Sequence, residues 1–275
     1  FLEQYNNSKV PFTELGEFVY LRTYSRFLES EGRREKWEET IKRAIEYNIN
    51  LELRFNPNAD VDKLRGEAEE LFENMYNLRQ FPSGRTLWVG GTEVADLFPI
   101  SNFNCSFLVM DSFEGFCEQF YLLMIGSGVG FRTMPYDVEK IPSFRTGIQL
   151  TLKDYRPVPK KHRKEFTSLK VEKDKAIIIV GDSKEGWITA LDLYFKLLTS
   201  FLYKNIKQVV LNFDNVRGKG ERLQRFGGTS SGHTSLKIMF EKIHKVMMAT
   251  DGKLKPIDAL DIGNIIAENV VSGGV

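Results

Sequence analysis

The sequence predicts an α/β fold in which buried strands alternate with helices, and three features support this prediction. A short apolar run, Phe107–Met110, is followed by a helix-start pattern, and the same order of strand, cap and helix returns from Ala176–Val180 onward. A third apolar run lies at Gln208–Phe213. Short apolar runs bounded by turn and capping residues are typical of buried strands, and their alternation with helices indicates α/β architecture.

The first part of the chain is expected to be a helical N-terminal region. In Arg34–Asn48 and again in Asp60–Leu78 the apolar residues recur at steps of three and four, as they do on one face of a helix. We interpret both faces as core packing. The pattern ends at Phe81–Arg85, where a proline and a glycine interrupt it.

The two later helix starts share the pattern Asp-Ser-x-Glu-Gly. In the first, Asp111 is expected to cap the helix with Glu114 as its capping-box partner, and the second begins within Asp182–Trp187. The glycine run Gly126–Gly130 ends the first helix. It follows a helix and not a strand, so it is no dinucleotide fingerprint, and a ligand-facing loop and a tight packing turn stay open as alternatives. Two further helices are expected around Ser235–Met248 and Ile257–Val271.

The composition argues against several classes of function. The 275 residues carry a net charge of +1, so the overall field favours neither nucleic acid nor a membrane surface as a partner. We expect no membrane span, because no apolar run is long enough, and a cytoplasmic location. The two cysteines and three histidines lack metal-ligand spacing, so we expect no metal site and a reducing compartment.

Three segments could carry chemistry, and each has a plainer alternative. By composition alone, Cys105 is more often a small core residue than a nucleophile. Arg217–His233 places cations among glycines and hydroxyls, which suits phosphate binding but also a flexible surface loop. The basic run Lys160–Lys164 is either a solvated loop or, beside a nucleotide site, a triphosphate contact.

Six segments, in order along nearly the whole chain, resemble the monomeric, cobalamin-dependent class of ribonucleotide reductase. They are Phe18–Arg26, Phe81–Gly91, Ser101–Phe107, Gly126–Phe131, Gly181–Trp187 and Phe226–His233. The resemblance implies a ten-stranded α/β barrel, made of two antiparallel halves of parallel strands, behind the helical region. This sequence would build only part of that barrel. It divides the chain into a helical region at 1–80, a first part of the barrel at 81–135, an effector-binding insertion at 136–206, and a continuation of the barrel at 207–275.

The resemblance also implies the reaction, in which a ribonucleoside triphosphate becomes a 2′-deoxyribonucleoside triphosphate. Adenosylcobalamin would initiate a thiyl radical, and two further cysteines would supply the electrons and form a disulfide. Cys105 matches the first of these redox cysteines. As a thiol buried in an apolar barrel it would stay protonated and could protonate the leaving hydroxyl. By the same match Ser83, Gly84 and Asn104 would lie near the substrate, whereas Cys117 matches no functional position and is expected in the core.

The stretch from Thr133 onward resembles the allosteric region of the same family, where a deoxynucleotide effector binds. The residues this implies for the effector and specificity sites are Asp137, Lys140, Arg217, Lys219, Arg222, Gly227, Gly228, Thr229, Ser230 and Ser231. Arg217–His233 would be the loop that passes the identity of the effector to the substrate base. A thioredoxin-type reductant is the implied protein partner.

The radical cysteine, the second redox cysteine and most of the cobalamin region have no counterpart in this sequence. We therefore expect an incomplete N-terminal segment of the reductase that is inactive alone and needs the missing C-terminal part as a partner. The alternatives are a non-catalytic deoxynucleotide-binding module, a fragment of a split reductase, and a generic nucleotide-binding α/β domain.

Overall fold

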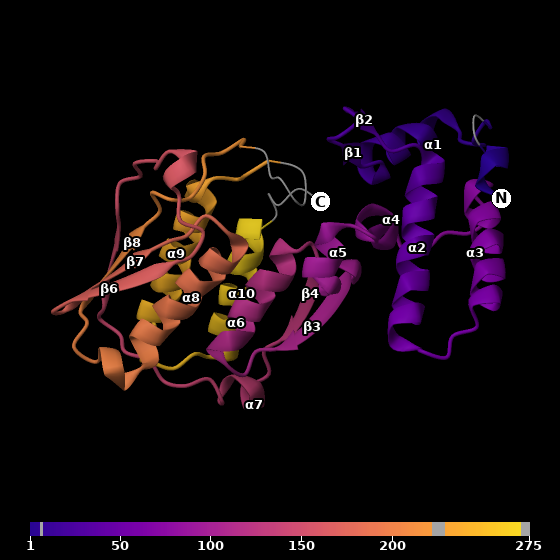
Figure 1. Ribbon diagram of the computed structural model, residues 1–275. Coiled ribbons are helices and arrows are strands. Elements are labelled where there is room, and N and C mark those ends of the chain that lie inside the picture. The colour runs from indigo at the N-terminus through magenta and orange to yellow at the C-terminus, as the bar shows by residue number, and fades with distance from the viewer. Residues whose placement is uncertain (6–7, 222–228, 271–275) are drawn as a thin grey trace. The chain divides into compact units, whose positions relative to one another are not determined.

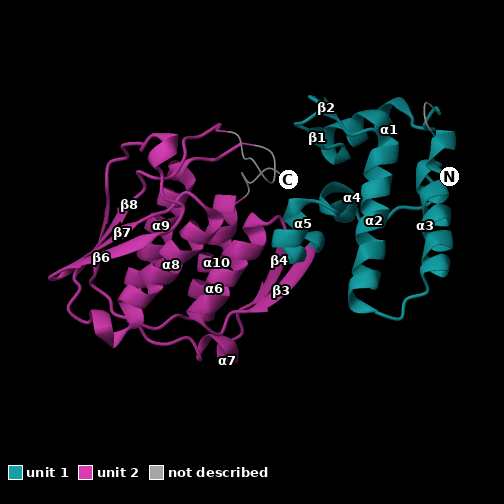
Figure 2. Cartoon of the chain, viewed as in Figure 1, with its two compact units in different colours: residues 1–104 teal, residues 105–275 magenta. Residues whose placement is uncertain are grey.

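A computed structural model describes residues 1–5, 8–221 and 229–270 of the chain. The chain forms two compact units, residues 1–104 and 105–275 (Figure 2). The four segments predicted from the resemblance have finer boundaries than these units, and those boundaries stay predictions.

Unit 1 is mainly helical, as the periodicity predicts. Its helices are α1 (Glu14–Val19), α2 (Trp37–Phe55), α3 (Val61–Tyr76), α4 (Gly84–Val89) and α5 (Glu93–Leu97). Shorter turns are η1 (Leu2–Tyr5), η2 (Tyr20–Tyr24) and η3 (Pro99–Asn102), and a small antiparallel hairpin joins β1 (Phe27–Leu28) to β2 (Arg33–Arg34).

The core of unit 1 lies between α2 and α3. Trp37 and Ile41 of α2 are buried together with Phe72 and Met75 of α3. The ring of Tyr20 packs edge-on against Trp37, with 5.1 Å between the ring centroids. The two long helices expected from the sequence are therefore confirmed, and their apolar faces meet as core-packing faces should.

A buried ion pair in unit 1 holds the C-terminal end of α4. Glu35 and Arg43 form a two-pronged contact of 2.7 and 2.8 Å, and their side chains are only 6% and 15% exposed. The same guanidinium donates to the carbonyl oxygens of Leu87 and Gly90, and Arg26 donates to that of Trp88. These carbonyls have no partners within the helix, so the two arginines complete the end of α4.

Unit 2 combines helices with two sheets (Figure 1). The strands are β3 (Cys105–Val109), β4 (Gly128–Arg132), β5 (Gln149–Leu152), β6 (Ser168–Glu172), β7 (Lys175–Ile179) and β8 (Gln208–Asn212). The helices are α6 (Phe113–Met124), α7 (Pro135–Val138), α8 (Lys184–Thr199), α9 (His233–Met248) and α10 (Pro256–Val270), with short turns η4 (Lys160–His162) and η5 (Phe201–Tyr203).

The strands form no ten-stranded barrel within the described residues, and the sequence predicts only part of one. β3 and β4 form a separate parallel pair, and the other strands form one sheet in the order β5-β8-β7-β6. In that sheet β5, β8 and β7 run parallel, while β6 is antiparallel to β7. The α/β class is confirmed and the barrel is not, because the described strands pair in two small sheets that share no ladder.

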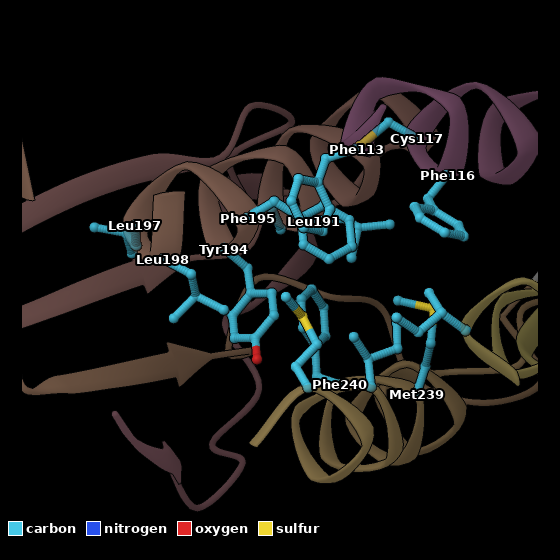
Figure 3. Close-up of a cluster of buried hydrophobic side chains, with 14 of the residues drawn as sticks. Phe113, Phe116, Cys117, Leu191, Tyr194, Phe195, Leu197, Leu198, Met239 and Phe240 are labelled. Carbon is cyan, nitrogen blue, oxygen red and sulfur yellow. The ribbon is translucent and has the colours of Figure 1, made fainter. Parts of the chain in front are cut away.

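The core of unit 2 lies where α6, α8 and α9 meet. Figure 3 shows Phe113 and Phe116 of α6 together with Leu191 and Tyr194 of α8 and Phe240 of α9. All five side chains are buried. The amphipathic helices predicted from the sequence thus pack as a layer of aromatic and aliphatic side chains.

One local prediction is wrong and another is incomplete. The N-cap of α6 is Ser112 and not Asp111, since the Ser112 hydroxyl accepts from the Gly115 amide at 3.2 Å. A serine one residue later sits where its side chain faces the free amides of the first turn. The glycine run also does more than turn the chain, because the strand β4 begins at Gly128.

Candidate functional site

Cys105 is the first residue of β3 and pairs in parallel register with Gly128 of β4. Side chains alternate along a strand, so Cys105 and Phe107 share one face of this pair, opposite Ser106 and Leu108. Both Cys105 and Phe107 are exposed. The partner positions on β4 are glycines, so little side-chain volume stands beside the thiol on this face.

The expected burial of Cys105 is therefore wrong for the described residues. The thiol lies on the outer face of a two-stranded sheet and is exposed to solvent. Cys117 behaves as predicted, since it lies in the core on α6. Burial raises the pKa of the Cys117 thiol far above its ordinary value, and nearby Asp192 adds to the effect.

The three predicted substrate residues lie in unit 1. Ser83 caps α4 by accepting a hydrogen bond from the Thr86 amide at 3.1 Å. Gly84 faces Tyr24 so closely that an added Cβ would lie 2.9 Å from the phenol oxygen. Asn104 accepts a hydrogen bond from the Nε of Arg85 at 3.3 Å, and both residues belong to the same unit. Their role toward a substrate stays a prediction.

Two predicted effector residues lie at α7, and both form ion pairs. Asp137 is 1% exposed, and its two carboxylate oxygens accept from Arg132 at 2.8 and 3.1 Å. Lys140 lies 3.9 Å from a carboxylate oxygen of Asp111. Asp137 therefore already has a strong partner in this structure, and its part in effector binding stays a prediction.

Arg217 is held by Asp182, at the start of α8. Its backbone amide and its Nε both donate to the same carboxylate oxygen, at 2.9 and 3.0 Å, and its Nη2 donates to the Asp182 carbonyl. The other carboxylate oxygen of Asp182 lies 3.5 Å from Arg163. Arg163 also binds both carboxylate oxygens of Glu221, at 2.9 and 2.8 Å.

The segments on either side of residues 222–228 are joined by backbone hydrogen bonds. The Gly220 amide donates to the Ser230 carbonyl and the Ser230 amide donates to the Glu221 carbonyl, both at 2.8 Å. We call residues 217–221 and 229–231 the neck.

Of the remaining predicted residues, Lys219 and Thr229 are exposed, whereas Ser230 is buried and Ser231 is half-buried. Arg222, Gly227 and Gly228 lie outside the described residues.

Sequence reasoning missed Arg163 and Glu221 as members of this site. In the sequence Arg163 is only one residue of a basic run, and its partner Glu221 stands 58 positions away. A single sequence carries no signal that links two charges so far apart, so only the folded chain reveals the pair.

Comparison with known proteins decides the family. Residues 1–92 match the family described as "Ribonucleotide reductase alpha domain", and residues 152–247 match "B12-dependent ribonucleotide reductase, insertion domain". A crystal structure of a B12-dependent (class II) ribonucleotide reductase superposes with a TM-score of 0.83 and 30% identity, covering 98% of this chain and 42% of that one. The chain belongs to the B12-dependent ribonucleotide reductases.

Curated relatives in this family agree. The adenosylcobalamin-dependent ribonucleoside-triphosphate reductase of Lactobacillus gasseri is 33% identical over 95% of this chain and 40% of its own length. The reductase of the same name from Lactobacillus helveticus is 34% identical over 100% of this chain and 42% of its own length. The chain thus spans about two fifths of the length of the relatives it matches.

No described residue of this chain can be assigned to cobalamin binding. Surface hollows of about 400 and 500 Å³ lie beside β5 and α9 and between α6 and α8. Neither of these hollows includes Cys105 or brings a histidine and a cysteine together. Within the described ranges, no group of three potential metal ligands occurs, and no helix is long and apolar enough to cross a membrane.

Proposed function

We propose that this chain forms part of an enzyme that reduces ribonucleoside triphosphates to 2′-deoxyribonucleoside triphosphates, with adenosylcobalamin as cofactor. The proposal rests on the family and on one observation, the exposed thiol of Cys105 at the start of β3. When bound, adenosylcobalamin supplies a radical by cleavage of its cobalt–carbon bond. We assign no residue of this chain to that step.

In the proposal Cys105 serves as one of two reducing thiols. The substrate exchanges its 2′ hydroxyl for hydrogen and releases water, which consumes two electrons and two protons. Cys105 and a second thiol, each giving one electron and one proton, become a disulfide and balance the reaction. A solvent-exposed thiol can meet both substrate and partner thiol, and it can later be reduced again by an external dithiol.

Cys117 does not serve as that second thiol. It is packed among the aromatic residues of α6 and α8, and burial raises its pKa well above the ordinary value. Both effects suppress the thiolate that disulfide exchange requires. Because the sequence has two cysteines in all, the second reducing thiol must come from outside these 275 residues.

Ser83, Gly84 and Asn104 are proposed to contact the substrate. The Ser83 hydroxyl and the Asn104 amide offer hydrogen bonds, whereas glycine at position 84 leaves room for the Tyr24 phenol. The Arg85 guanidinium that holds Asn104 is 7% exposed and stacks over the Trp88 ring at 5.2 Å. That packing fixes the orientation of the Asn104 side chain.

The insertion and the neck are proposed to respond to a deoxynucleoside triphosphate effector. A second candidate function is a module that binds deoxynucleotides without catalysis. The charged network of the neck favours it, because that network contains guanidinium groups and carboxylates but no cysteine. The two functions differ in whether the complete protein turns over.

The test is reduction of a radiolabelled ribonucleoside triphosphate by the complete protein that carries this sequence, with adenosylcobalamin and dithiothreitol. We expect a 2′-deoxy product that depends on the cofactor. Deoxynucleotide binding with no product would favour the binding module instead.

A further inference from the structure

Arg163 connects three segments that are distant in sequence. Its Nε donates to the Val158 carbonyl, and its Nη1 contacts Glu221 in the neck and Asp182 at the start of α8. The Arg163 side chain is only 12% exposed, so water screens these contacts little. Planar guanidinium groups suit such multiple contacts, whereas a lysine offers a single point charge.

The backbone around Arg163 is itself fixed against α8. The Asp182 amide donates to the Lys164 carbonyl at 2.8 Å, and the Ser183 hydroxyl donates to the Glu165 carbonyl at 2.6 Å. Thr167 accepts from the Gly181 amide and donates to the Gly186 carbonyl. Arg163 therefore projects from a rigid support.

The neck also depends on Arg163 for its second attachment. Asp182 holds Arg217 at the first end of the neck. Arg163 holds the side chain of Glu221, whose backbone carbonyl accepts a hydrogen bond from the Ser230 amide. Two guanidinium groups and two carboxylates alternate, so the network is neutral within itself. A phosphate group that approaches Arg217 competes with Asp182, and the released carboxylate remains beside Arg163.

We propose that Arg163 is a positioning residue that sets the geometry of the neck and thereby the discrimination among deoxynucleoside triphosphates. The specificity part of this inference rests on the proposed function, whereas the positioning part stands on the described contacts alone. Arg163 acts through Glu221 and Asp182 and is not assigned a contact with nucleotide.

The experiment compares Arg163→Gln, Arg163→Lys and Glu221→Gln in the 275-residue chain, with Lys170→Gln as the control. Lys170 is an exposed residue of β6, so Lys170→Gln changes the net charge by the same amount as Arg163→Gln. Hydrogen exchange reports the protection of the Gly220 and Ser230 amides, and calorimetry gives the affinities for dATP, dGTP, dTTP and dCTP.

We expect Arg163→Gln and Glu221→Gln to lower the protection of both amides by about tenfold, as for loss of one partly buried charged contact. The amides of β8 and the melting temperature should stay unchanged. Differences in affinity among the four nucleotides should narrow by about fivefold or more, within the usual range of coupling. Arg163→Lys should restore part of both properties, and Lys170→Gln should match the unaltered chain.

Unchanged protection of Gly220 and Ser230 in both neutral variants would overturn the positioning role, whatever the chain binds. If the protection of the Gly220 and Ser230 amides falls but the differences in affinity among the four nucleotides stay unchanged, the specificity role alone would be overturned. If the unaltered chain bound none of the four nucleotides, the proposed function of this region would fail, and amide protection would still decide the positioning.

Discussion

At the scale of single residues, the two cysteines occupy opposite environments. Cys105 is exposed at the start of a strand, while Cys117 is 8% exposed in a core of aromatic rings. Burial, with the nearby Asp192 carboxylate, raises the pKa of Cys117 far above its usual range, so almost no thiolate forms at neutral pH. Reactivity and accessibility therefore both select Cys105.

Thiol labelling of the native chain should separate the two cysteines. We expect iodoacetamide to modify Cys105 at least about a hundredfold faster than Cys117, because only thiolate that reaches solvent reacts. Mass spectrometry of tryptic peptides measures the ratio. Equal rates in urea would serve as the control, and rapid native labelling of Cys117 would contradict the packing of α6.

The carboxylates of unit 1 should make its stability depend on pH. Hydrogen bonds from Arg33 lower the pKa of Glu39 to about 2. Burial by itself raises the pKa of Glu35, but the bonds from Arg43 and Thr40 outweigh it and leave that pKa below its usual value. A lowered folded-state pKa adds stability that is present above the unfolded value of 4.5 and is lost as pH falls toward the folded value.

We therefore expect the free energy of unfolding to fall between about pH 5 and about pH 3. Urea unfolding followed by circular dichroism measures this free energy. Glu39→Gln should reduce the difference in the free energy of unfolding between the two pH values. A difference that Glu39→Gln and Glu35→Gln both leave unchanged would remove these residues as its cause.

The sequence identifies Cys105 as the candidate only through the family resemblance. Its residue type and neighbours favour an ordinary core cysteine, and its exposure could not be foreseen because that depends on which strands cover it. The pairing of Arg163 with Glu221 is equally hidden, since a contact between distant charges leaves no local pattern.

At the scale of elements, α6 and α8 begin in the same way. Ser112 accepts from Gly115 and Ser183 accepts from Gly186, at 3.2 and 2.9 Å. Ser183 also donates to Glu165, which ties α8 to the segment that carries Arg163.

Replacing each N-cap serine with alanine should show how much the additional bond from Ser183 to Glu165 contributes to stability. Ser112→Ala should cost about 1 kcal/mol of stability, the usual effect of losing an N-cap. Ser183→Ala should cost about 1 kcal/mol more than Ser112→Ala, because it also leaves the Glu165 carbonyl without its donor. Chemical denaturation measures both, with Ser183→Thr as the matched control. Equal costs would mean that the bond to Glu165 contributes nothing.

Strands with continuous apolar runs were predictable and the others were not. Ala176–Val180 and Gln208–Phe213 correspond to β7 and β8 within one residue at each end. β6 contains two apolar residues among five and β4 contains two glycines, so neither has a continuous apolar run. Their pairing with β7 and β3 supplies what the local sequence lacks.

At the scale of the whole molecule, the chain has a single accessible thiol among its described residues. The proposed reaction needs two, so the 275 residues alone should give no turnover with adenosylcobalamin and dithiothreitol. Deoxynucleotide binding by the same preparation would show that the chain is folded. Product formation above background would contradict the requirement for a thiol from elsewhere.

The central claim, that Cys105 is a reducing thiol of a ribonucleoside-triphosphate reductase, is tested most directly by a single turnover. The complete protein is reduced, freed of external thiols and mixed with adenosylcobalamin and ribonucleoside triphosphate, and deoxynucleotide is quantified. The account predicts about one equivalent of product per pre-formed dithiol for the unaltered enzyme, none for Cys105→Ser, and a normal yield for Cys117→Ser. A full equivalent from Cys105→Ser would contradict it.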